Sequence, residues 1–396
     1  MEASLSRKIR NISFLLMILV ACIHGYNYNL SFTDQAASEA SSWLFFIQRF
    51  SSDGFCRIAV PIFFAVSGYL ASESIRRKLD LPAYASLLRK RIFSLLIPYL
   101  LVSAAGLALV FMLQLFPASR PFFIHYSLEH SSLSDLLRMW LLDLVPFPLW
   151  FIRFLLNYFL FFPVLYFGVR FLREAFLFAA MLAWMWPFLY HQFGIWKIAF
   201  SMCTFLFCHL SGTDFTPYLP TQKNELEGLF FFTLGIYASI HRIPLIMQAG
   251  KKWLLWLLPV WLGWVAYRSL LVLEGFPAQM AIHYHQVTFT LAGSVLIWYL
   301  YDFFAGELDR LQWLRRFSPY SVGVFLFHEP LLTILKKGLI RIGGSGDFSL
   351  LLSFLISPVL AFLGALWFSV YLARWLPAVY NLFTGNRSPA GSEEAV

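Results

Sequence analysis

The chain has 396 residues, of which 59% are hydrophobic and 13% are charged, and its formal net charge is +9. This composition excludes a soluble domain, and because no basic patch sits on a soluble module, the positive charge fits cytoplasmic loops better than nucleic-acid binding. Apolar runs of about 18 or more residues recur along the chain, each long enough to cross ~30 Å of hydrocarbon. The alternating strands of an outer-membrane barrel are absent. We therefore predict an all-α, polytopic transmembrane helical bundle with about ten spans.

The chain begins with a short basic segment, residues 1–10, which is followed by an apolar run from Ile12 to about Leu30. A cleaved signal peptide is the alternative interpretation, but the run is long and no small-residue cleavage site follows it. Further runs of spanning length continue through the rest of the chain. In chain order, the predicted spans are Ile12–Leu30, Phe55–Ser72, Ile92–Leu115, Leu149–Gly168, Leu172–Tyr190, Leu226–Ile240, Trp253–Leu273, Ile282–Phe304, Tyr320–Leu335 and Leu350–Arg374.

One further apolar segment, Ile195–Leu210, is too short to assign by length. The distribution of charge decides whether this segment crosses the membrane, because cytoplasmic loops of membrane proteins are enriched in Lys and Arg. If the segment does not cross, both termini are cytoplasmic and most of the 30 Lys and Arg residues lie on cytoplasmic segments, with Lys336, Lys337 and Arg341 as exceptions. We therefore expect residues 195–210 to be re-entrant or to lie in the interface.

The domain organisation is simple. We expect one integral membrane domain over residues 1–384 and a short, polar, disordered cytoplasmic tail over residues 385–396. Four cysteines lie in or beside apolar segments without metal-ligand spacing, so we expect buried thiols and no metal site. They are Cys22, Cys56, Cys203 and Cys208.

Ionisable residues inside the spans are functional candidates, because each must find a partner or water within the membrane. His24 lies about 18 Å from the cytoplasmic end of the first span, at 1.5 Å per residue, and so in its outer half. Arg57 is expected at the outer mouth of the second span, where it could also snorkel to the headgroups. Arg153 lies one turn into the fourth span from outside, with Asn157 on the same helix face at i+4. Three helices therefore bring polar groups to one depth, which predicts a site.

The residue types suit acyl or proton chemistry. Imidazole accepts a proton near neutral pH, which suits general-base catalysis, and the fork of donors on arginine suits a carboxylate, a phosphate or an oxyanion. His328 and Glu329, followed by Pro330, lie in the middle of the ninth predicted span. They could form a proton relay or a helix-packing contact, and the sequence leaves both interpretations open.

Four stretches carry a resemblance to a known family. They are LLMILVACIH ending at His24, RIAVPIFFAVSGYL after Cys56, LRKRIFSLLIPYL, and SPYSVGVFLFHEPLL around His328; PLWFIRFLLNYFLFFP is a fifth, weaker one. In these residues the sequence resembles the integral-membrane acyltransferase family 3, which contains bacterial O-acetyltransferases of surface polysaccharides. The stretches follow one another in the order of the family and span nearly the whole chain.

The resemblance implies about ten helices and transfer of an acyl group, usually acetyl from acetyl-CoA, to a hydroxyl of a glycan or another envelope molecule. It places the essential first-helix histidine of the family on His24. Many members carry an arginine eleven residues before that histidine, where this chain has Ser13. The donor-side cations are then expected elsewhere, at Arg10, Arg89, Lys90 and Arg91.

The leading functional hypothesis is an O-acyltransferase of the bacterial inner membrane, in which His24 acts on the acceptor hydroxyl while Arg57 and Arg153 bind anionic atoms. The expected partners are acyl-CoA, a glycan or lipid-linked saccharide acceptor and membrane lipids, with no permanently bound cofactor and no nucleic acid. The alternative is a proton-coupled transporter, because intramembrane His, Arg and Glu also describe permeases. Transporters of that kind often contain internal repeats, and no internal repeat stands out here, which favours the enzyme.

Overall fold

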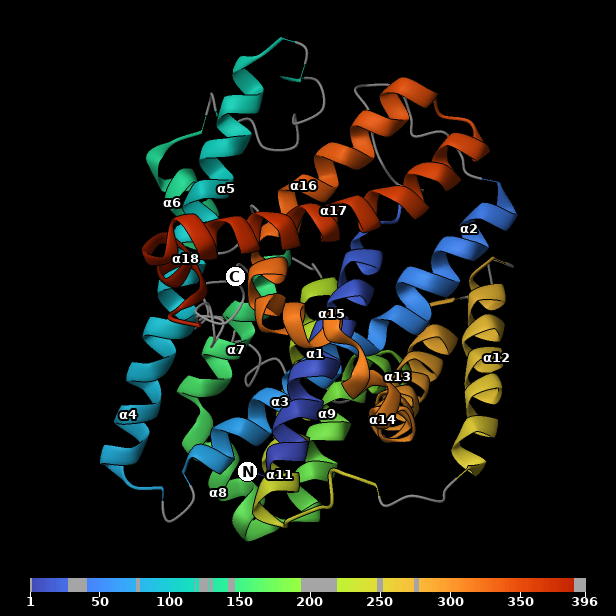
Figure 1. Ribbon diagram of the computed structural model, residues 1–396. Coiled ribbons are helices and arrows are strands. Elements are labelled where there is room, and N and C mark those ends of the chain that lie inside the picture. The colour runs from blue at the N-terminus through green and yellow to red at the C-terminus, as the bar shows by residue number, and fades with distance from the viewer. Residues whose placement is uncertain are drawn as a thin grey trace.

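In the computed structural model every regular element of the described chain is a helix, which confirms the predicted all-α class (Figure 1). The structure describes the backbone but not the side chains of residues 147, 186–193, 219–225, 272–273 and 278–284. The described residues are 2–27, 41–75, 79–117, 119–120, 128, 131–141, 147–193, 219–247, 252–273 and 278–387. Residues 195–210, for which we expect a re-entrant or interfacial segment, lie outside this set, as do residues 388–396 of the tail predicted for 385–396.

The α-helices differ widely in length, and the short ones join or cap the long ones. They are α1 (Ala3–His24), α2 (Ser42–Gln48), α3 (Ala59–Ser74), α4 (Leu81–Arg91), α5 (Ile97–Leu115), α6 (Leu133–Leu141), α7 (Trp150–Leu160), α8 (Phe162–Leu172), α9 (Glu174–Phe193), α11 (Leu219–Ile240), α12 (Trp253–Leu273), α13 (Ala278–Phe303), α14 (Ala305–Arg310), α15 (Gln312–Phe317), α16 (Ser321–Gly343), α17 (Asp347–Trp375) and α18 (Pro377–Thr384).

Several helices have the length and composition of membrane spans, so the chain is a multi-pass membrane protein. Within the described residues four continuous helical stretches qualify: Ser42–Ser74, Leu81–Leu115, Trp253–Leu271 and Asp347–Trp375. The pair α7 and α8 qualifies as a fifth, although it is bent by 63° at its junction. The larger number of crossings expected from the sequence stays a prediction.

The helices extend beyond the predicted spans where polar residues flank an apolar run. The second span is predicted from Phe55 but belongs to a helix that begins at Ser42, with a π-helical stretch at Arg49–Gly54 and a 3₁₀ turn at Phe55–Ile58. The first helix similarly begins at Ala3. An apolar run marks the part of a helix that crosses hydrocarbon, and it does not show where the polar ends of that helix lie.

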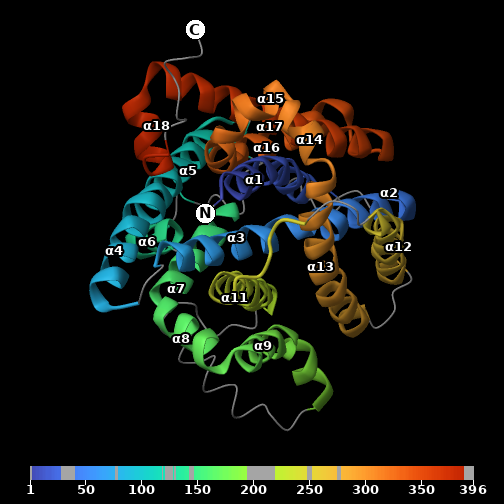
Figure 2. The same cartoon turned by 60° about the horizontal axis from the view of Figure 1, so that its bottom comes forward.

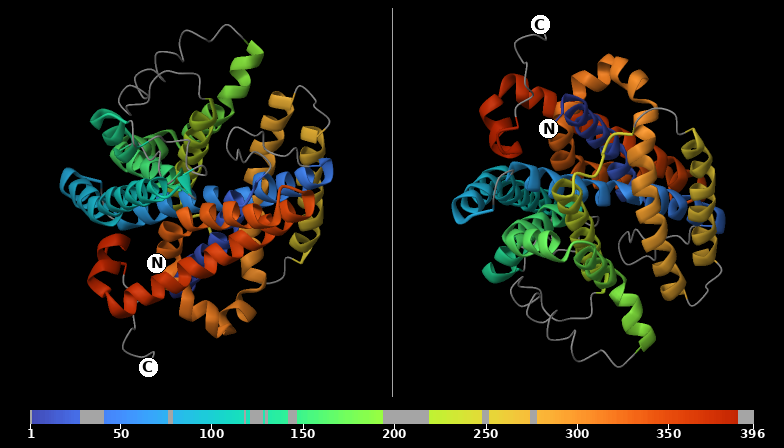
Figure 3. Two further views of the ribbon diagram at one scale, coloured as in Figure 1. Left: turned by 90° about the horizontal axis from the view of Figure 1, so that it is seen from above. Right: turned by 90° about the horizontal axis from the view of Figure 1, so that it is seen from below.

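Helices α1 and α3 occupy the centre of the bundle, with α4 and α5 along one edge and α12 and α13 along the opposite edge (Figures 1 and 2). The views along the bundle show α16 and α17 packed on α1 (Figure 3). The aromatic contacts are dense, and one core cluster joins α3, α7, α8 and α11. The centre of the molecule is therefore the place where α1, α3, α11 and α16 meet.

The end of the bundle that carries the N-terminus gathers the segments that the charge pattern assigns to one side. Lys8 of α1 forms a buried ion pair with Asp302 at the end of α13, at 2.8 Å, and Arg7 lies 3.0 Å from Asp309. The N-terminal residues also lie with the ends of α3, α8 and α11 around one cavity. These segments share one end of the molecule, as the predicted topology requires.

Candidate functional site

His24 is the last residue of α1, and its position is fixed by contacts to the end of that helix. Backbone carbonyls at a helix C-terminus have no intrahelical partner. Here the Ser52 hydroxyl donates to the carbonyl of Cys22 at 2.7 Å, and the Lys336 ammonium donates to the carbonyls of His24 and Tyr26 at 2.9 and 3.0 Å. A lysine of α16 thus satisfies the end of α1 and holds His24 at one depth.

A buried amide pair strengthens this anchorage. Asn27 donates from its backbone N–H to Gln48 Oε1 at 2.9 Å, and Gln48 Nε2 donates to Asn27 Oδ1 at 2.7 Å. The Asn27 side chain also donates to the carbonyl of Leu350 at 2.8 Å. Both amide side chains are buried, so leaving either one unpaired would carry a desolvation penalty. The end of α1 is therefore joined to α2 and α17.

His328 of α16 lies beside His24, with ring centroids 5.9 Å apart. The His328 side chain is fully buried, and its Nδ1–H donates to the carbonyl of Phe325 at 2.7 Å. With the proton on Nδ1, Nε2 carries a free lone pair, and among the described residues this atom has no hydrogen-bond partner. His328 is therefore oriented with an unused basic nitrogen in the interior.

Helix α16 is interrupted directly after His328. Glu329 has an extended backbone, with φ −105° and ψ 138°, and Pro330 begins the second half of the helix. The Glu329 carboxylate accepts from the backbone N–H of Thr333 at 3.3 Å and lies within electrostatic range of His328 and Lys336. Glu329 thus caps the second half-helix and balances the buried lysine, and both roles are local and structural.

Arg57 lies on the 3₁₀ turn, well inside the continuous helix Ser42–Ser74. The helix continues on both sides of Arg57, and its expected place at the outer mouth of a span stays a prediction. Its guanidinium is within electrostatic range of His24, Tyr26 and Glu227. The structure thus brings Arg57 and His24 together, with His328 beside them.

Glu227 of α11 was not predicted from the sequence, although it is a carboxylate buried to 4% exposure. Among the described residues, Arg57 is the charged group that acts on it electrostatically. A buried carboxylate is stable in its charged form only when a cation or several donors compensate it. In the sequence, Glu227 is an acid at the start of an apolar run. An acid at the membrane surface gives the same pattern, so the sequence does not distinguish the two.

Close packing of α3 and α11 sets the distance between Arg57 and Glu227. A Cβ atom on Gly68 would lie 2.0 Å from the Phe232 carbonyl oxygen, and one on Gly235 would lie 1.9 Å from that of Ala65. The glycine of the SGY stretch, Gly68, thus allows close helix contact. The pairing of Phe64 with Gly228 and of Glu73 with Ser239 shows that the two helices run parallel.

Arg153 and Asn157 share one face of α7, as their spacing predicts. Both side chains are half-buried, and the Arg153 guanidinium lies 5.3 Å from the ring of Phe154. Helix α7 reaches the site through Phe151, whose ring lies 5.7 Å from that of Phe325, the residue that binds His328. A role for Arg153 or Asn157 in the reaction stays a prediction.

The four cations that we expect on the donor side lie in different environments. Arg10, Arg89 and Lys90 are exposed, whereas Arg91 is half-buried with its guanidinium 4.4 Å from the centre of the Phe159 ring. The three exposed side chains remain accessible to an anionic ligand. Arg91 is held by packing against an aromatic face, which is itself a stabilising contact.

The site can carry out proton transfer and bind an anion. Two cationic imidazoles 5.9 Å apart would repel each other, so at least one of His24 and His328 stays neutral and can accept a proton. Arg57 supplies a guanidinium at the same depth. Among the described residues no cluster of His, Cys, Asp and Glu has the geometry of a metal site.

Comparison with protein families gives one match: a family described as "Acyltransferase domain" matches residues 9–374. The matched region covers nearly all of the chain and includes every helix that contributes to the site. Comparison with curated proteins and with solved structures gave no match.

Proposed function

Because the chain belongs to the acyltransferase 3 family, we propose that it is an O-acyltransferase that transfers an acyl group, in the simplest case acetyl, from acyl-CoA to a hydroxyl group of a cell-envelope glycan or lipid-linked saccharide. The observation that carries this proposal is the pair of neighbouring imidazoles, the half-buried His24 and the buried His328, within electrostatic range of the Arg57 guanidinium. Acyl transfer to a hydroxyl requires a base and a stabiliser of the oxyanion, and these residue types supply both.

The reaction follows from these groups. The acceptor oxygen attacks the carbonyl carbon of the thioester while its proton passes to the neutral imidazole of His24. The new C–O bond forms, the C–S bond breaks, and the proton moves from the imidazolium to the departing thiolate, which gives the acyl ester and free CoA. His328, with its unpartnered Nε2, is positioned to exchange that proton with His24.

Arg57 stabilises the negative charge that develops on the carbonyl oxygen during attack. Glu227 holds the guanidinium in place by compensating its charge inside the membrane. Arg153, on the neighbouring helix α7, is proposed to bind an anionic part of the acceptor or donor. Acyl-CoA is a substrate, and its phosphates are attracted to the exposed cations Arg10, Arg89 and Lys90 with Arg91 nearby.

The proposed orientation follows the charge pattern. The end of the bundle that contains the N-terminus, Lys8 and the ends of α3, α8 and α11 faces the cytoplasm of a bacterium, and both termini lie on that side. His24 and Arg57 then lie in the outer half of the membrane, where an envelope acceptor arrives. A reporter fused to the C-terminus that is active only outside the cell would reverse this assignment.

Mass spectrometry of envelope glycans from cells with and without this protein tests the proposal. We expect an acyl mass difference that disappears in His24→Ala cells, because loss of a general base lowers rates about 10²–10⁴-fold. Arg57→Lys keeps the charge but loses the guanidinium fork, and it should still impair turnover. Near-normal acylation by well-folded His24→Ala protein would refute the mechanism, and glycans identical with and without the protein would refute the acceptor class.

A further inference from the structure

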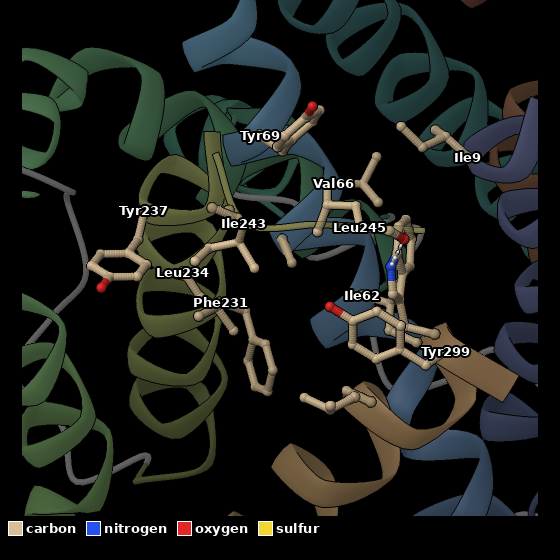
Figure 4. Close-up of a pocket in the computed structure, with 16 residues that line it drawn as sticks. Ile9, Ile62, Val66, Tyr69, Phe231, Leu234, Tyr237, Ile243, Leu245 and Tyr299 are labelled. Carbon is tan, nitrogen blue, oxygen red and sulfur yellow. Dashed lines mark hydrogen bonds between the residues drawn. The ribbon is translucent and has the colours of Figure 1, made fainter. Parts of the chain in front are cut away.

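A groove runs between α3, α11 and α13 on the N-terminal half of the bundle (Figure 4). Its volume is about 300 Å³, and its walls are almost entirely apolar. Figure 4 shows Ile62, Val66 and Tyr69 of α3 on one wall and Phe231 and Leu234 of α11 on another. We call this cavity the α3–α11 groove.

The groove adjoins a wider polar cavity, here called the mouth, at the end of the molecule that carries the N-terminus. This mouth has a volume of about 980 Å³ and shares Tyr69, Ala238, Ile243 and Leu245 with the groove, so the two cavities are neighbours. Its charged lining side chains include two arginines and two acids. They are Arg170, Arg242, Glu2 and Glu73.

Two residues that line the groove lie close in the chain to residues of the candidate site. Ile62 lies five residues after Arg57 on α3, and Phe231 lies four residues after Glu227 on α11. At 1.5 Å per residue, α3 covers about 16 Å from Glu73 at the mouth to Ile62, and about 8 Å more leads to Arg57 on the 3₁₀ turn that precedes α3. A ligand held in the mouth could therefore extend an arm along α3 towards the imidazoles.

One polar side chain in the apolar walls indicates what kind of arm this is. Ser294 of α13 lines the groove and is only 5% exposed, and its hydroxyl has no hydrogen-bond partner among the described residues. A buried hydroxyl without a partner costs about 1–3 kcal/mol. The chain would recover that cost if the occupant of the groove carried an amide or another hydrogen-bonding group.

We propose that the α3–α11 groove binds the pantetheine arm of the acyl-CoA donor, with Ser294 bonded to an amide of the arm. The nucleotide phosphates lie in the mouth near Arg170 and Arg242, and the thioester reaches Arg57 and Glu227. This inference rests on the proposed function. A lipid tail would also fit apolar walls, but it would leave Ser294 unpaired and would not use the arginines of the mouth.

This assignment moves the nucleotide away from the cations on α4. Arg89, Lys90 and Arg91 are not among the described residues that line the groove or its mouth. They remain able to attract acyl-CoA to the membrane surface electrostatically. The docked nucleotide instead binds the arginines at the ends of α8 and α11, Arg170 and Arg242.

Binding of coenzyme A and of pantetheine to the full-length protein in nanodiscs, measured by titration calorimetry, tests the assignment. Val66→Trp fills the groove and should weaken both ligands at least tenfold. Ser294→Ala removes one hydrogen bond and should weaken both by about two- to tenfold. The double variant Arg170→Gln with Arg242→Gln should weaken coenzyme A and leave pantetheine unchanged. Val260→Trp, at an exposed position of α12, is the matched control and should change neither.

The outcomes separate this inference from the proposed function. If the unmodified protein binds coenzyme A and the Val66 and Ser294 variants bind it equally well, the groove assignment is wrong while the donor chemistry stands. Loss of a co-purifying phospholipid from Val66→Trp, with coenzyme A binding intact, would identify a lipid groove instead. A decrease caused by Arg89→Gln but not by the mouth variants would place the nucleotide on α4. No binding of coenzyme A by the unmodified protein would refute both proposals.

Discussion

Replacement of Gly68 by alanine tests whether the packing of α3 on α11 holds the site together. A Cβ atom at Gly68 would lie 2.0 Å from the Phe232 carbonyl oxygen, whereas ordinary contacts begin at 3.4 Å. The shortfall is about 1.4 Å, and the obstacle is backbone, which cannot rotate away like a side chain. The two helices must therefore move apart in Gly68→Ala.

The energetic cost can be bounded. Overpacking a well-packed interior costs about 1–3 kcal/mol, and the backbone contact favours the upper end of that range. Alanine in a helix interior returns up to about 1 kcal/mol relative to glycine. We expect the free energy of unfolding to fall by about 2 kcal/mol. Activity should fall further, because Arg57 lies on the turn that leads into α3, Glu227 lies on α11, and a misplacement of about 1 Å can cost 10²-fold in rate.

The assay combines denaturant unfolding of the purified protein in detergent with the rate of acyl-CoA consumption. The matched control is Gly263→Ala on α12, where an added Cβ would meet nothing within 4 Å. That variant should be unchanged or up to about 1 kcal/mol more stable, with normal activity. If Gly68→Ala behaves like Gly263→Ala in both measurements, α3 and α11 do not pack as described and the proposed alignment of the site is wrong.

Three further substitutions test separate parts of the structure. In His328→Asn the amide nitrogen can keep the bond to the backbone carbonyl while the basic Nε2 is lost; acyl transfer should fall about 10²–10⁴-fold with unchanged unfolding, and a near-normal rate would exclude His328 from proton transfer. Lys8→Met leaves Asp302 buried and uncompensated and should lower the free energy of unfolding by about 3–5 kcal/mol. Adding Asp302→Asn to the same chain should restore most of this stability. If it does not, the ion pair is contradicted. Lys336→Met leaves two carbonyls at the end of α1 without their donor and should lower the free energy of unfolding by about 1–3 kcal/mol. Arg341→Met, at an exposed position, should leave the free energy of unfolding unchanged. Equal losses of stability in the two variants would contradict the capping role of Lys336.

The sequence predicts the spans best where hydrophobicity alone determines them. The predicted span Trp253–Leu273 coincides with α12, and Leu350–Arg374 lies within α17. In both segments the apolar run fills almost the whole helix. The prediction is poorer for Phe55–Ser72, because the polar stretch that carries Gln48 and Asp53 is helical as a result of packing inside the protein. Tertiary contacts extend that helix by more than a dozen residues.

The cations at the end of α16 show a second limit of sequence reasoning. Lys336, Lys337 and Arg341 are exceptions to the charge rule, which treats every Lys and Arg beyond a span as a loop residue. In the structure Lys336 is a buried part of α16 and donates to the end of α1. Its positive charge therefore belongs to a contact between two helices and does not mark a loop. Glu227 escaped notice for the related reason that only the parallel alignment of α3 and α11 brings it to Arg57.

Three irregular points of the described backbone carry or adjoin residues of the candidate site. The 3₁₀ turn that carries Arg57, the end of α1 at His24 and the break in α16 after His328 come from three segments far apart in the sequence. Non-helical backbone at membrane depth is tolerated only where protein or a water-filled cavity surrounds it. Three such interruptions around one site would be costly in a bundle that served only to pack, because continuous helices satisfy their own hydrogen bonds. Their coincidence, next to the inner end of the α3–α11 groove, therefore favours a reaction centre over a chance meeting of polar side chains.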